Sequence, residues 1–83
     1  MTVKIEVHFY SYLKEIVERS SLEVELTEGS TINELFSQLA RLHPKIGVLA
    51  NSILFAVGVE YQGRSYLLKE GDKVSLFPPV QGG

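Results

Sequence analysis

Cysteine is absent from this sequence of 83 residues, and histidine occurs only twice, at His8 and His43. Without cysteine there is no disulfide, no thiolate metal site and no cysteine nucleophile, so a chain this small must be stabilised by core packing. Structural zinc usually takes four protein ligands, which two histidines without cysteine companions do not supply. We therefore expect no metal site in this chain.

An excess of charge of one sign is also lacking, as are long apolar runs. The formal net charge is −2, and the lysines and arginines are scattered among acidic residues, so no basic face is available to neutralise phosphates. The longest apolar stretch, residues 53–59, is far shorter than the roughly 20 residues that span a bilayer, and residues 1–6 lack the apolar core of a signal peptide. We predict a soluble cytoplasmic protein that binds neither nucleic acid nor membrane.

Five stretches read as strands. Apolar and polar residues alternate in 3–9, 22–26 and 73–77, which is the two-residue period of a strand with one buried face. The continuous apolar run 53–57 predicts a central strand covered on both faces, and 66–68 predicts a short edge strand. The first two strands should pair antiparallel if their connection is a hairpin.

Helical signals lie between these strands. Thr31 followed by Glu34 matches a capping box, and an apolar stripe follows it at three- and four-residue spacing, made of Ile32, Leu35, Phe36, Leu39 and Leu42. The pair His43-Pro44 should end this helix, and 45–51 should be a loop. A short helix is expected within 11–18. The fold class is therefore α+β, with one main helix across a mixed sheet of four to five strands.

Two aromatic residues should emerge together from this sheet. If the last strand lies parallel to the first, Tyr10 and Phe77 both point away from the core, near the point where the chain leaves the domain. They form either an apolar anchor for a partner or ordinary half-exposed packing. Lys14 is either paired with a partner carboxylate or a solvated charge.

After a domain formed by residues 1–77, residues 78–83 predict an extended tail. Pro78 and Pro79 fix φ and stiffen the segment, although proline also commonly ends a strand. Gly82 and Gly83 lack a Cβ, so this end can enter a slot too narrow for any side chain, whereas a frayed tail is the plainer alternative. The carboxylate of Gly83 is the predicted functional group.

These residues resemble the ubiquitin-like, β-grasp sulfur carriers, most closely the MoaD family, the small subunits of molybdopterin synthase. The resemblance rests on 7–10 with 13–15, on Thr31, on 71–74 and above all on 76–83. The related thiamine-pathway carriers, the ThiS type, usually lack the two prolines. This chain has Gly58, Tyr10 and Lys14 where the MoaD family often has Asn, Phe and Arg.

The resemblance implies a role and a set of partners. An E1-like adenylyltransferase of the MoeB type would use ATP to adenylate Gly83, and a sulfur donor protein would convert it to a thiocarboxylate. A large subunit of the MoaE type would then accept the tail, and the sulfur would pass to cyclic pyranopterin monophosphate. The chain itself would bind no cofactor. The implied partner contacts are Tyr10, Lys14, Phe77, Pro78, Pro79, Val80 and Gln81, with Gly82 and Gly83 at the reacting end.

Three other functions stay open from the sequence. The same tail could carry sulfur for thiamine synthesis or tRNA thiolation. It could also be joined through Gly83 to a lysine, as in a ubiquitin-like modifier. A β-grasp interaction module with an inert tail is the third alternative.

Overall fold

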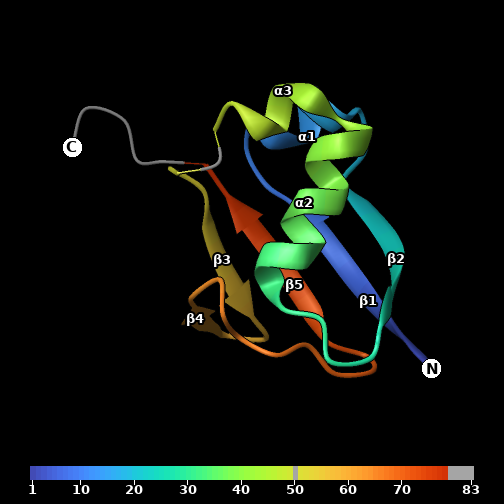
Figure 1. The fold of residues 1–83 in the computed structure, drawn as a ribbon. Helices are drawn as coiled ribbons and strands as arrows, with labels where there is room; N and C mark the ends of the chain where they lie inside the picture. The colour runs from blue at the N-terminus through green and yellow to red at the C-terminus, as the bar shows by residue number, and fades with distance from the viewer. Residues whose placement is uncertain (50, 79–83) are drawn as a thin grey trace.

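A computed structural model describes residues 1–49 and 51–78, and Figure 1 shows its elements. In chain order these are β1 (Thr2–Phe9), α1 (Leu13–Val17), β2 (Ser21–Thr27), α2 (Ile32–Leu42), α3 (Pro44–Gly47), β3 (Leu54–Val57), β4 (Glu60–Gln62) and β5 (Lys73–Phe77). The strands described form one sheet in the order β2-β1-β5-β3-β4. Only β1 and β5 pair in parallel, so the predicted mixed sheet is confirmed.

The core lies between one face of this sheet and α2, which crosses that face in Figure 1. Alternate residues of β1 and β5 point to this inner face because their register places equivalent positions side by side. The α2 stripe meets them, and Phe36 contacts Phe55 of β3 edge-on, with ring centroids 5.8 Å apart. The buried residues of these elements include Val3, Ile5, Val7, Phe9, Ile32, Leu35, Phe36, Leu39, Val74 and Leu76.

The start of α2 agrees with the sequence, but its last turn does not. Thr31 and Glu34 form the predicted capping box, with the Glu34 N–H donating to Thr31 Oγ1 and the Thr31 N–H donating to Glu34 Oε1. Leu42 is predicted to belong to the buried stripe, but it is 60% exposed. The helix continues past the edge of the core, so periodicity alone overestimates the length of its buried face.

Two segments differ from their predicted secondary structure. The predicted loop 45–51 begins with the one-turn helix α3, because Pro44 at its first turn already has a helical φ and Ile46 packs into the core. The predicted edge strand 66–68 makes only a single bridge, between Thr31 and Leu67. Its neighbouring carbonyl groups instead accept from the first N–H groups of α2, which holds this segment against the helix.

β3 also differs from its prediction as a central strand covered on both faces. β5 occupies the centre of the sheet, and β3 lies between β5 and the short strand β4. The inner face of β3 is buried at Phe55, whereas Leu54 on the outer face is 45% exposed. Ala56 on the same outer face is buried, so this face of β3 is open to contacts only at Leu54.

The β3–β4 hairpin depends on one glycine. Gly58 begins its two-residue turn with a φ of +65°, a conformation that side chains rarely adopt. We expect Gly58→Ala to lower the free energy of unfolding by about 1 kcal/mol or more. Gly63→Ala is the matched control, because Gly63 has no positive φ and a Cβ there would meet open space. Urea unfolding of both variants measures the difference, and equal losses would contradict a conformational role for Gly58.

Candidate functional site

The outer face of the sheet carries an aromatic stack where β5 ends. Phe9 pairs with Leu76 in the parallel ladder, so the next residues, Tyr10 and Phe77, lie side by side on the opposite face from the core. Their rings stack with centroids 4.8 Å apart and planes 13° from parallel. The Tyr10 N–H donates to the Leu76 carbonyl oxygen at 3.2 Å. The predicted emergence of both aromatic residues on the outer face is therefore observed at the end of β5.

Two further residues enlarge this stack into a surface that we call the aromatic patch, made of Tyr10, Leu54, Tyr61 and Phe77. Leu54 pairs with Phe77 across β3 and β5, and Tyr61 meets the Phe77 ring edge-on at 6.1 Å. Sequence reasoning missed Leu54 because it assigned both faces of β3 to the core, and it missed Tyr61 because it predicted no strand at residues 60–62. The signal that could have found them is Gly58, whose turn brings β4 back beside β3.

The patch continues into a groove beside β4. This groove has a volume of about 360 Å³ and shares Leu54 and Tyr61 with the patch, while Gly63 and Arg64 form its far side. Arg64 itself is held in place, because its guanidinium lies 4.9 Å from the centre of the Phe36 ring and donates to Asn33 Oδ1. Apolar surface therefore extends from the end of β5 around the edge of the sheet.

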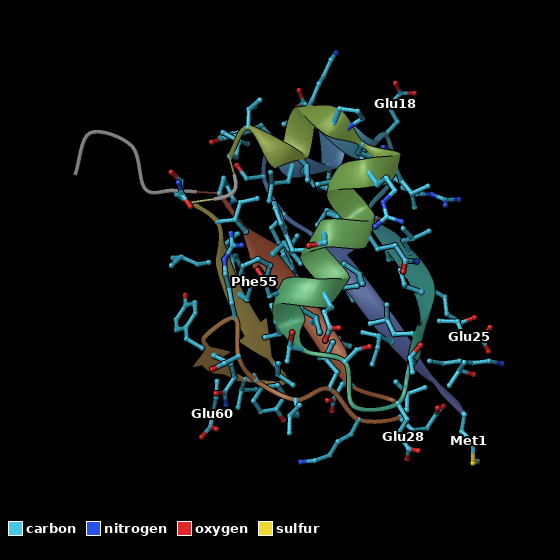
Figure 2. All side chains as sticks on the ribbon, viewed as in Figure 1. Met1, Glu18, Glu25, Glu28, Phe55 and Glu60 are labelled. Carbon is cyan, nitrogen blue, oxygen red and sulfur yellow. The ribbon has the colours of Figure 1, made fainter. Side chains whose placement is uncertain are left out.

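The described residues offer a surface for contacts but few groups for chemistry. At the start of α2, the N–H groups of Ile32 and Asn33 donate to the carbonyl oxygens of Tyr66 and Arg64, and the N–H of Glu34 donates to Thr31. These donors, which bind anions at many helix starts, are already satisfied by the protein. The acidic side chains Glu18, Glu25, Glu28 and Glu60 point outward at the rim in Figure 2.

The described residues contain neither a candidate metal-binding cluster nor a candidate membrane-spanning helix. Within residues 1–49 and 51–78, no three acidic or histidine side chains are grouped closely enough to hold a metal ion. In the same part of the chain, no helix has the length and apolar character that crossing a membrane requires.

The other predicted site residues have mixed outcomes. Lys14 lies on α1 and is exposed, and none of the ring contacts found among the described residues includes it. Pro78 follows β5 directly and is half-buried. Pro79, Val80, Gln81, Gly82 and Gly83 lie outside the described residues, so the predicted role of the tail end stays a prediction.

Curated proteins similar to this chain include sulfur carrier subunits and a protein modifier. The molybdopterin synthase sulfur carrier subunit of Chlamydomonas reinhardtii is 29% identical over 84 residues, which cover 98% of this chain and all of that protein. Small archaeal modifier protein 3 of Haloferax volcanii is 25% identical over 95 residues, which cover 98% of this chain and all of the modifier.

Solved structures agree with the predicted β-grasp fold. The putative molybdopterin converting factor subunit 1 of Pyrococcus furiosus has a TM-score of 0.85 at 27% identity, covering 94% of this chain and 99% of its own. A complex of subunits 1 and 2 of the molybdopterin-converting factor of Helicobacter pylori contains a chain with a TM-score of 0.66 at 21% identity. That match covers 98% of this chain and all of the other, and at this identity it bears on the fold alone.

The comparison with family models gives the decisive match. The model of the ThiS family aligns with residues 7–83, a range that includes β1 from Val7 onward, every later element and the tail. The predicted membership in the MoaD and ThiS group of sulfur carriers is thereby confirmed at the level of the family. This chain belongs to the ThiS family.

Proposed function

We propose that this chain is the sulfur carrier subunit of a molybdopterin synthase. The observation that carries the proposal is the aromatic patch at the end of β5, an apolar docking face immediately before a tail led by Pro78. Curated relatives with this function match the chain along nearly its whole length. The proposal requires a free carboxyl group on Gly83.

The chemistry takes place on the tail and uses the groups of partner enzymes. A carboxylate is a poor acyl donor, so one oxygen of the Gly83 carboxylate first attacks the α-phosphate of ATP on an E1-like enzyme, which releases pyrophosphate. A persulfide on a sulfur donor protein then displaces AMP to give an acyl disulfide. A second thiol attacks the donor's sulfur in this S–S bond, which forms a new disulfide and releases the thiocarboxylate. Its sulfur passes to cyclic pyranopterin monophosphate on the large synthase subunit, and water restores the carboxylate. ATP is consumed on the activating enzyme, and this chain holds no cofactor.

The domain contributes recognition to this sequence of reactions. Aromatic rings bury much apolar area with few rotatable bonds, so a face containing Tyr10, Tyr61 and Phe77 suits a partner that must bind and release the carrier. Pro78 reduces the conformational freedom that the tail loses when it docks. We place the protein in the cytoplasm, where the activating enzyme and ATP would be available.

Intact-mass analysis of the chain purified from its host tests the proposal. A population that is heavier by the mass difference between one sulfur and one oxygen atom would support a sulfur carrier. This population should disappear when Gly83 is deleted. A chain that carries only its ordinary carboxylate, and that an E1-like enzyme from the same host cannot adenylate, would refute it.

A second candidate is a protein modifier, which the similarity to small archaeal modifier protein 3 favours. In this case a lysine amine attacks the Gly83 adenylate, AMP leaves, and an isopeptide bond forms. The same mass measurement separates the two functions. Conjugates of higher mass that yield branched peptides ending in Gly-Gly after proteolysis would support the modifier.

The patch can be tested at its most exposed ring. Tyr61 is 68% exposed, so its replacement removes contact area without opening the core. We expect Tyr61→Ser to weaken binding to the large subunit about tenfold or more, as for an aromatic anchor at an interface centre. The matched control is Val59→Ser in the same hairpin, where the side chain is 99% exposed and outside the patch. Calorimetric titration measures both, and equal losses would contradict a specific role for the patch.

A further inference from the structure

Phe77 is the last residue that the sheet holds before the tail begins. On one side, Leu54 of β3 pairs with it. On the other side lies Tyr10, whose N–H donates to the carbonyl oxygen of Leu76 and whose ring covers the Phe77 ring at 4.8 Å. Tyr61 touches the same ring only by an edge, at 6.1 Å. Of the two ring contacts described for Phe77, the one with Tyr10 is therefore the closer.

We propose that Tyr10 is a positioning residue for the tail, in addition to being part of a docking face. By stacking on Phe77, it keeps the end of β5 in the sheet and fixes the position and direction of Phe77, the residue after which the tail begins. The consequence for sulfur transfer rests on the proposed function. The structural consequence does not, because it is measurable on the isolated chain.

The length of the tail makes its starting direction important. From Phe77 to Gly83 the chain reaches at most about 20 Å. A swing of about 20° at Phe77 would move the end of a fully extended tail by about 7 Å, whereas a misplacement of about 1 Å can cost a hundredfold in rate. A partner's pocket can correct such a swing only by ordering more of the chain, which weakens binding.

The backbone after Tyr10 supports this role. Ser11 has a φ of +56°, in the left-handed region that favours glycine. Ser11 lies in a tight turn that the Leu13 N–H closes by donating to the Tyr10 carbonyl oxygen at 3.1 Å, and Leu13 is buried in the core. Non-glycine residues keep such a conformation only where their surroundings determine it, and they occur often at functional sites. The residues on either side of this turn are thus both held in place, Leu13 by the core and Tyr10 by its stack on Phe77.

Hydrogen exchange in the isolated full chain tests the proposal. We expect Tyr10→Ala to raise the exchange rate of the Phe77 amide about two- to tenfold, the range that corresponds to the usual coupling of an aromatic pair. Tyr10→Phe, which keeps the ring, should retain the original rate. The amide of Ile5 in the core should not change, since an equal rise there would mean global destabilisation and would overturn the proposal.

Tyr61→Ala provides a matched control within the patch. It removes a ring that only touches Phe77 by its edge, so it should change the Phe77 exchange rate less than Tyr10→Ala does. A rise as large as that of Tyr10→Ala would mean that any loss of patch area loosens β5, which would overturn a specific role for Tyr10.

A double-mutant cycle on sulfur transfer gives the functional readout. If Tyr10 acts partly through Phe77, Tyr10→Ala should lower the transfer rate at least about twofold less when Phe77 is already alanine than it does in the original chain. Equal effects in both backgrounds, or slower transfer with unchanged Phe77 exchange, would assign Tyr10 to direct partner contact and overturn the proposal. Failure of the proposed function would be recognised separately, because the unaltered chain would then transfer no sulfur whatever the exchange rate of the Phe77 amide.

Discussion

Deleting Gly83 should abolish sulfur transfer, with a loss of at least about a hundredfold in rate. The deletion moves the terminal carboxyl group back by one residue, about 3.3–3.6 Å, and a shift of this size takes the reacting carbon out of any pocket built for it. Pyrophosphate release by the activating enzyme measures the loss in the adenylation step. Single-turnover transfer to the pterin measures the loss in the sulfur-transfer step.

Two controls separate the position of the carboxylate from the stability of the fold. Adding one glycine after Gly83 moves the carboxyl group outward by a similar distance and should also be strongly defective. In the described ranges the last buried side chain is that of Leu76. The free energy of unfolding of both variants should therefore lie within about 0.5 kcal/mol of that of the original chain. Full transfer activity in either variant would contradict the assignment of Gly83 as the sulfur-bearing residue.

The largest loss of stability should follow Leu35→Ala in α2. Leu35 is fully buried against the sheet, so truncation removes apolar contacts and leaves a cavity, which typically costs about 2–5 kcal/mol. Native domains are stable by only about 5–15 kcal/mol, and a chain of this size is expected at the lower end. Urea unfolding followed by circular dichroism should therefore show a greatly lowered midpoint or no folded baseline.

Leu42→Ala is the matched control for this loss. Both leucines belong to α2, at positions 35 and 42, and both variants exchange one good helix former for another, so helix propensity contributes little to either loss. Leu42 is 60% exposed, and its truncation should cost no more than about 0.5 kcal/mol. Similar losses at both positions would mean that the last turn of α2 packs more tightly than its exposure indicates.

Most of the fold could be predicted because the signals are local. Alternation in β1, β2 and β5 specifies strands with one buried face, and the capping box at Thr31 specifies where α2 begins. The pairing of Tyr10 with Phe77 followed from the same alternation once β5 was placed parallel to β1. The strands and the start of α2 depend on residues that are close in sequence, whereas the placement of Tyr10 beside Phe77 also required the assumption that β5 lies parallel to β1.

The errors occurred where distant residues compete for the same groups. The segment 66–68 has the composition of a strand, but the carbonyl oxygens of Tyr66 and Arg64 are taken by the first N–H groups of α2. Leu42 continues the helical period beyond the edge of the sheet, so no partner is left to bury it. Periodicity reports which face an element would bury, but it does not report whether another element covers that face.

The candidate site also has a part that the sequence predicts and a part that depends on the tertiary structure. Local chemistry in the sequence determined the alternating strands, the capped helix and a tail of prolines and glycines, because each depends on short-range sterics and hydrogen bonding. Only the tertiary structure decided that Leu54 and Tyr61 join Tyr10 and Phe77, since this grouping requires β3, β4 and β5 to lie side by side. Contacts between residues that far apart depend on sheet order, which no single stretch of sequence encodes.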